Sequence, residues 1–309
     1  MARDLEYSYI GPYLRDWLEY VRKKNDADQQ MIADGNEFRV PFVGVQTEMI
    51  QMIFLLSSRY DLEPQAKHMA VHLLDQYMAR LFWEIVSNSP KLNDKAAEKQ
   101  LRDKMSSQVR LVMVICLQIA SKVDLYKTGL DVEQVQNILK WVDSKKEYNK
   151  SSICSCEKRI LEALDWRLPI CLPIDAVELF LVYADLASKP KVRDSCLRLL
   201  DVAYLRHAEL FEQMHLLATG RPYDKSLRVC RNFLELETNS AFLGAAIVIC
   251  SNFFFCLKRK IVDSLAARLA NLIEMSAVDV SIMANVLFSF VVDEDDLKNL
   301  QSTSDNEVD

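Results

Sequence analysis

Two histidines and an aspartate stand on one predicted helix face, where they could bind a metal ion. His68, His72 and Asp75 are spaced i, i+4 and i+7, so a helix would bring them to the same side. Imidazole nitrogens and carboxylate oxygens are common zinc ligands. Because no strong ligand is recognisable beyond the two histidines, we interpret the group as a polar stripe on an amphipathic helix. We predict no metal and no other cofactor.

Known signatures of catalysis are missing from the sequence. His207 and His215 stand eight residues apart, which is not the H-E-x-x-H spacing of zinc peptidases. We find no glycine-rich phosphate loop, no G-x-S-x-G turn and no catalytic Cys/His pattern. Cys154 and Cys156 form a C-x-C and not the C-x-x-C of zinc and redox sites. We therefore predict a protein that is not an enzyme, with an unrecognised helical enzyme as the remote alternative.

The composition favours long helices. The 309 residues include only 6 glycines and 8 prolines, too few for the many tight turns of a sheet-rich protein. Half of the residues are hydrophobic, which excludes a largely disordered chain. The length suffices for two domains, each with its own core. The sequence predicts an all-α fold.

Two nearly continuous apolar runs, at 111–120 and 241–257, are expected to form the central helices of two bundles. Each run is the third of five predicted helices, and the runs begin 130 residues apart, which suggests an internal duplication. The second run has 17 residues, fewer than the roughly 20 of a membrane span, so we predict a buried helix and no membrane contact. The predicted helices are 45–59, 64–86, 111–120, 131–142 and 151–164, then 174–183, 192–214, 241–257, 261–273 and 276–291.

A short helix is predicted before these bundles and an acidic tail after them. The helix carries one apolar stripe at i, i+3, i+4 and i+7, which we expect to pack on the body of the protein, with contact to a partner as the alternative. The stripe consists of Leu14, Trp17, Leu18 and Val21. The predicted organisation is an N-terminal helix and linker at 1–44, a first bundle at 45–168, a second bundle at 169–292 and a disordered tail at 293–309.

The charge is concentrated in the tail. Residues 293–309 contain seven acidic side chains and one lysine, which accounts for the whole net charge of −6. A neutral body lacks the positive field that binds phosphate backbones, so direct nucleic-acid binding is not expected. The eight cysteines form no disulfide-like pattern, and the polar N-terminus shows no signal peptide. We expect a reducing compartment, either the nucleus or the cytoplasm.

Three segments of the chain resemble the cyclin family. They are YDLEPQAKHMAVHLLDQYMARL at 60–81, CLQIASKV at 116–123 and EKRILEALDWRLPICLPIDAVELFL at 157–181. The specific feature is A-S-K at the end of an apolar helix, followed about 35 residues later by E-x-x-I-L-x-x-L-x-W. The resemblance covers about residues 45–292 and implies two tandem five-helix cyclin-like boxes.

Lys122 and Glu157 are the candidate binding residues. Taken alone, the lysine is explained by favourable placement of a cation at a helix C-terminus, and the glutamate by solvation near a helix start. In cyclins a lysine and a glutamate at matching positions hold the regulatory helix of the kinase. The resemblance therefore implies that Lys122 and Glu157 bind a cyclin-dependent kinase, and we expect them to lie close together on a shared edge.

A second feature of the family is degraded in this chain. Many cyclins carry an apolar substrate-docking patch of the Met-Arg-Ala-Ile-Leu type followed by a tryptophan. Here the matching segment runs from Val45 to Met49, and Met52 takes the place of the tryptophan. The arginine is missing and Glu48 interrupts the apolar run. This departure from the family pattern speaks against substrate docking and, with it, against an ordinary cell-cycle role.

Within the family, the likeness is to a divergent meiotic branch associated with crossover formation. It rests on MIFLLSSRYDLE at 52–63, LRDKMSSQVRLVMVICLQIASKV at 101–123 and LLDVAYLRHAELFEQM at 199–214. We expect a nuclear regulatory or scaffold protein that binds a cyclin-dependent kinase and meiotic recombination proteins. The alternatives are a cyclin-fold interaction module without kinase activation, or a cell-cycle or transcription cyclin.

Overall fold

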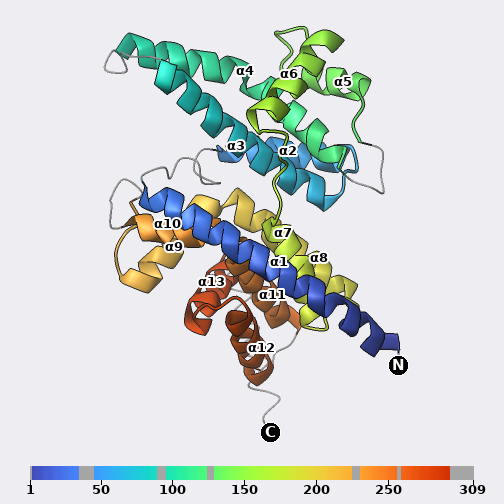
Figure 1. Ribbon diagram of the computed structural model, residues 1–309, viewed down its shortest axis with the longest axis vertical. Helices are drawn as coiled ribbons and strands as arrows, with labels where there is room; N and C mark the ends of the chain where they lie inside the picture. The colour runs from blue at the N-terminus through green and yellow to red at the C-terminus, as the bar shows by residue number, and fades with distance from the viewer. Residues whose placement is uncertain are drawn as a thin grey trace. The chain divides into compact units, whose positions relative to one another are not determined.

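The computed structural model describes residues 2–34, 45–88, 95–123, 129–224, 230–255 and 259–292. Across these ranges every regular element is a helix, which confirms the all-α prediction. The chain divides into two compact units (Figure 1). The first unit is Asp28–Leu172, and the second unit combines Met1–Ala27 with Pro173–Asp309.

The first unit has the five helices expected of its part of the sequence. These are α2 (Thr47–Arg59), α3 (Pro64–Asn88), α4 (Lys95–Ser121), α5 (Val132–Val142) and α6 (Lys150–Ala163). The central helix is α4, which packs against the other four. Its residues 112–120 are all buried, as the apolar run predicted. This run forms the core on which the candidate site is built.

Side-chain caps fix where α5 and α6 begin. The Asp131 carboxylate accepts a hydrogen bond from the backbone N–H of Gln134, whose own side chain accepts one from the N–H of Asp131. This reciprocal capping box satisfies two N–H groups that would otherwise have no partner. At the start of α6, the Asn149 side chain accepts from the N–H of Ser152. The polar residues Asp131 and Asn149 therefore fix where α5 and α6 begin.

The second unit is built around α11 (Ser240–Phe255), which packs against four other helices of the unit. Its residues 240–252 are all buried, as predicted for the second apolar run. Besides residues 2–27 of the N-terminal helix, this unit contains α7 (Pro173–Tyr183), α8 (Pro190–Leu205), α9 (His207–Thr219), α10 (Arg231–Thr238), α12 (Arg259–Leu272) and α13 (Ala277–Ser289). Gly244 allows α11 to approach α7 closely, because a Cβ at this position would lie 2.5 Å from the Cβ of Ala176.

The described part of the second half contains seven helices, where the sequence predicted five. The expected helix 192–214 is broken at Arg206, which separates α8 from α9. The Arg206 guanidinium pairs with Glu209 and lies 3.9 Å from the ring centre of Phe290. The contact with Phe290 joins distant parts of the chain, and the pair with Glu209 forms at the break itself. The spacing of apolar residues along the predicted helix reveals neither contact. The short helix α10 was not predicted either.

The N-terminal helix is longer than predicted, because α1 extends over 32 residues, Ala2–Ala33. Its apolar stripe packs within the second unit, where Leu14, Leu18 and Val21 are buried. Trp17 meets Phe180 of α7 edge to face, with ring centres 6.2 Å apart. These contacts confirm that the stripe packs on the body. The predicted disordered tail, 293–309, lies outside the described residues.

Candidate functional site

The structure brings Lys122 and Glu157 together, although 35 residues separate them in the sequence. The Nζ atom of Lys122 lies 2.5 Å from the Oε1 atom of Glu157. The lysine side chain is 43% exposed and the glutamate 20% exposed. Solvent therefore reaches the ion pair, so a partner could contact both groups without opening the fold.

A small set of hydrogen bonds positions Lys122, which directly follows α4. The Ser121 hydroxyl donates to the Gln118 carbonyl at 2.8 Å and accepts from the Leu130 N–H at 2.9 Å. The Gln118 side chain in turn donates to the Leu130 carbonyl at 3.4 Å. These groups are buried, where an unmade hydrogen bond would be costly. We call Gln118, Ser121, Gly129 and Leu130 the α4 latch.

Gly129 allows the returning chain to touch the end of α4. A Cβ on Gly129 would lie 2.9 Å from the Cα and N of Lys122 and from the carbonyl oxygen of Ser121. All three are backbone atoms, so a side-chain rotation cannot relieve the contact. Between Gly44 and Gly220 the chain has no other glycine. The isolated glycine is therefore a signal in the sequence, although Gly129 was not among the predicted site residues.

Glu157 is held by the packing of α6. The helix buries Ile153, Cys156 and Ile160 in the first unit, which leaves Glu157 at the border of its buried face. At the other end of α6, Arg80 of α3 donates to the Ala163 carbonyl and to the Asp165 carboxylate. The hydrogen bond from Arg80 lowers the pKa of Asp165. Both ends of α6 are thus fixed, one by a cap and the other by this arginine.

A buried carboxylate ties the α5–α6 connection to α4. Asp143 follows α5 and accepts a hydrogen bond of 2.7 Å from the Tyr148 hydroxyl. Arg110 of α4 donates to the other carboxylate oxygen at 3.3 Å. The Tyr148 hydrogen bond, followed by the charges of Lys146 and Arg110, lowers the pKa of Asp143 against the opposing effect of burial. The cluster helps to hold the first turn of α6 in place, and with it Glu157.

The degraded docking patch lies at the start of α2. Val45 precedes the helix, and Val45, Met49 and Met52 are all partly exposed, while α2 buries a separate face formed by Ile50, Ile53, Leu56 and Ser57. Glu48 is exposed beside them. The surface that remains is a partly covered apolar patch with a carboxylate in it. Its binding properties stay a prediction.

The structure corrects the interpretation of His68, His72 and Asp75 as an exposed polar stripe. All three are buried on α3, and His68 is completely inaccessible to solvent. The His68 ring meets Phe54 of α2 edge to face, with ring centres 5.6 Å apart. Within the described ranges, no group of three or more histidine, cysteine, aspartate or glutamate side chains is arranged to hold a metal ion. A helix with neighbours on several sides can bury polar residues that its own pattern places outside.

The sequence predicts no membrane-spanning segment, and the described helices can be compared with the length and apolar character that such a segment needs. Among them, none combines the length and the apolar character that crossing a membrane requires. The most apolar of them, α11, contains Ser251, whose hydroxyl donates to the Val192 carbonyl at 3.2 Å. This polar contact is made within the protein core.

Residues 17–169 match the family described as "Cyclin, N-terminal domain". The mouse protein Cyclin N-terminal domain-containing protein 1 is 26% identical over 220 residues, which cover 67% of this chain and 64% of the mouse protein. Its human counterpart is 24% identical over 250 residues, covering 78% of this chain and 73% of that protein. Human Cyclin-J is 26% identical over 137 residues, 44% of this chain and 31% of Cyclin-J. The chain thus matches less than two thirds of the mouse relative's length.

The matched family region contains the candidate site. Lys122, Glu157 and the patch residues Val45, Met49 and Met52 all lie within residues 17–169. The match ends between α6 and α7, so the helices of the second half are outside it. The site therefore belongs to the part of the chain with the clearest relationship to known proteins.

Proposed function

We propose that this chain is a regulatory protein that binds a cyclin-dependent kinase, because its residues 17–169 match the cyclin N-terminal domain family. The Lys122–Glu157 pair is the proposed contact. The chain would contribute binding and positioning, and the kinase would carry out the chemistry. This proposal rests on the family relationship and on the geometry of the pair.

The observation that carries the proposal is the placement of a donor and an acceptor side by side on an accessible edge. A lysine ammonium can donate to backbone carbonyls, and a carboxylate can accept from backbone N–H groups. In the free chain Lys122 and Glu157 satisfy each other at 2.5 Å. A partner helix offers both kinds of group at its two ends, since its first N–H groups and its last carbonyls have no partner within it. Binding can therefore exchange one set of hydrogen bonds for another.

We further propose that the protein acts in the nucleus, in meiotic recombination and crossover formation. The support is the resemblance of residues 52–63, 101–123 and 199–214 to a meiotic branch of the family, together with the similarity to Cyclin N-terminal domain-containing protein 1. Recombination proteins would be further partners. The exposed Glu48 beside Met49 and Met52 favours this specialised role over that of a cyclin that docks cell-cycle substrates.

Purification of the tagged chain from meiotic tissue, with partners identified by mass spectrometry, tests the proposal. The wild-type chain should recover a cyclin-dependent kinase, and the Lys122→Glu/Glu157→Ala variant should not. The matched control is Lys158→Glu/Glu162→Ala, which removes another exposed ion pair from α6. This control should recover the kinase as the wild type does. Absence of kinase from the wild-type sample, or equal recovery by the site variant, would contradict the proposal.

A further inference from the structure

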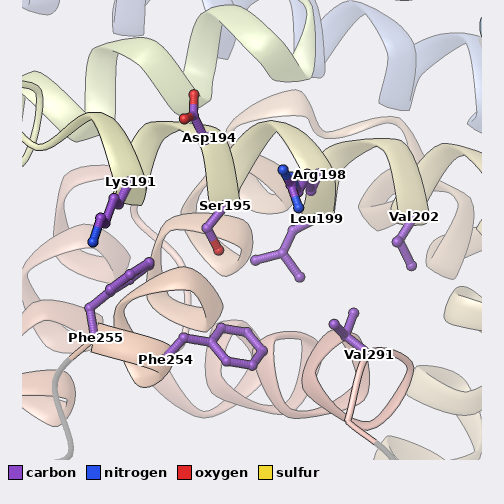
Figure 2. Close-up of a pocket in the computed structure, with 9 residues that line it drawn as sticks. All are labelled: Lys191, Asp194, Ser195, Arg198, Leu199, Val202, Phe254, Phe255 and Val291. Atoms are coloured by element: carbon purple, nitrogen blue, oxygen red, sulfur yellow. The ribbon is translucent and has the colours of Figure 1, made fainter.

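A groove in the second unit is lined by α8, by the end of α11 and by Val291, which follows α13 (Figure 2). Its volume is about 460 Å³. The lining residues are Lys191, Asp194, Ser195, Arg198, Leu199, Val202, Phe254, Phe255 and Val291. Every lining residue belongs to the second unit, so the groove is defined within one compact body.

The floor of the groove is apolar and partly open to solvent. Phe254, Phe255 and Val291 are 38%, 49% and 45% exposed. Phe254 is held in place by stacking on Phe288 of α13, with ring centres 5.1 Å apart. Exposed large apolar side chains that gather in one concave surface indicate a binding site more often than isolated ones do.

The rim of the groove is basic on the side that faces this floor. In Figure 2, the side chain of Lys191 extends toward the side of the groove where Phe255 lies, while the carboxylate of Asp194 points away from the phenylalanines. Arg198 extends from the next turn of α8 after Asp194. An occupant that combines acidic and apolar side chains would therefore match both the rim and the floor.

The chain itself contains such a segment where it leaves the groove. Val291 lines the groove, and two residues later the sequence continues as Asp293-Glu294-Asp295-Asp296-Leu297-Lys298-Asn299-Leu300. We propose that this acidic segment docks in the groove of its own chain, with the acidic run against Lys191 and Arg198 and with Leu297 and Leu300 over the phenylalanines.

The connection is long enough for this arrangement. Leu297 is six residues from Val291, and six residues span at most about 20 Å when extended. A segment too poor in apolar residues to fold alone can still become ordered on a complementary surface. Because the segment is tethered at the edge of the groove, its effective concentration there exceeds that of a free partner. The contact should weaken with added salt, since exposed charges are screened.

The test measures how fast a thiol placed in the groove reacts in the full-length chain. Ser195→Cys introduces the thiol, and alkylation by iodoacetamide is followed site by site by mass spectrometry. Cys154, which is exposed on α6, gives the reference rate within the same molecule. Buried Cys250 reports unfolding, because it should react only if the core opens. A tail docked about four-fifths of the time slows alkylation about fivefold.

Two further variants of the S195C chain distinguish the possible occupants. Leu297→Ser/Leu300→Ser should restore fast alkylation, and so should Arg198→Glu. A new carboxylate beside a thiol disfavours the thiolate and by itself slows the reaction, so acceleration by Arg198→Glu cannot be a direct effect. Unchanged alkylation in the leucine variant would overturn the proposal and leave the groove to another partner. Protection that disappears on dilution would also overturn it, because the occupant would then be the tail of a second copy.

Discussion

Replacing Gly129 by alanine would place a methyl group against the backbone that carries Lys122. The new Cβ would lie 2.9 Å from the Cα and N of Lys122 and from the Ser121 carbonyl oxygen. Favourable contacts between carbon atoms lie at about 3.5–4.0 Å, so the two segments must separate by about half an ångström or more. That movement would strain the 2.9 Å hydrogen bond from Leu130 to Ser121.

The expected cost is the balance of three effects. Overpacking typically costs about 1–3 kcal/mol, and a weakened buried hydrogen bond adds about 1 kcal/mol. Replacing glycine restricts the unfolded chain, which returns about 0.4–1 kcal/mol where alanine can adopt the native backbone. Gly129 meets this condition, since among the described glycines only Gly220 has a positive φ. We expect a net loss of about 1–3 kcal/mol in the free energy of unfolding.

Chemical denaturation and kinase pulldown together test this prediction. Gly129→Ala should lower the denaturation midpoint and also weaken kinase binding, because Lys122 moves. Gly220→Ala is the control, with a φ of +69° that strains alanine and with no atom within 4 Å of the new Cβ. It should lower stability by about 1–2 kcal/mol and leave kinase binding unchanged. A Gly129→Ala chain as stable as the wild type would refute the reasoning about the α4 latch.

Three further predictions concern other parts of the chain. Because Tyr148 lowers the pKa of Asp143, the stability that this carboxylate supplies is present above about pH 4 and is lost as the pH falls through the lower pKa of the folded state. Asp143→Asn should therefore reduce the slope of the free energy of unfolding against pH between pH 2 and 6. A slope equal to that of the wild type would count against this prediction. Gly244→Ala would place a Cβ 2.5 Å from that of Ala176 and should lower the free energy of unfolding by about 3 kcal/mol. Kinase binding should not change. An unaltered midpoint of thermal or chemical unfolding would contradict the close packing of α11 on α7. The face around Met52 should bind Arg-x-Leu peptides no more strongly than about −5 kcal/mol by calorimetry, and low-micromolar binding that Met52→Ala abolishes would show this to be wrong.

The central helices were predictable because nearly every residue in each of them is apolar. Residues 111–120 and 241–257 are apolar on nearly all sides, and only the centre of a bundle accommodates such a helix. The N-terminal stripe was predictable for a related reason, since its spacing alone defines one apolar face. These patterns are local, and packing reinforces them.

The features that the sequence did not predict depend on distant residues. The break at Arg206 is accompanied by contact with Phe290, which is 84 residues away in the chain. His68 is buried where α3 packs against α2, and its ring meets Phe54 of that helix. The α4 latch depends on the chain returning at Gly129 and Leu130 to the end of a helix that it has already left. Periodicity within one helix contains none of this information.

The closeness of Lys122 and Glu157 came from the family resemblance and not from their spacing, because 35 intervening residues allow many arrangements. The structure supplies the 2.5 Å contact, while the binding role remains the proposal. An ion pair between exposed side chains contributes only about 0–1 kcal/mol to folding. The pair therefore adds little to stability, and its contribution can be separated from a contribution to binding.

The exchange variant Lys122→Glu/Glu157→Lys tests the central claim most directly, because it keeps an ion pair at the site and reverses its direction. Its melting temperature should match that of the wild type. Its affinity for the purified kinase should fall by at least about thirtyfold, the lower limit for disrupting a buried charged contact. The matching exchange of Lys158 and Glu162 on α6 should change neither quantity. An exchanged Lys122–Glu157 pair that binds the kinase as tightly as the wild type would contradict the proposed site.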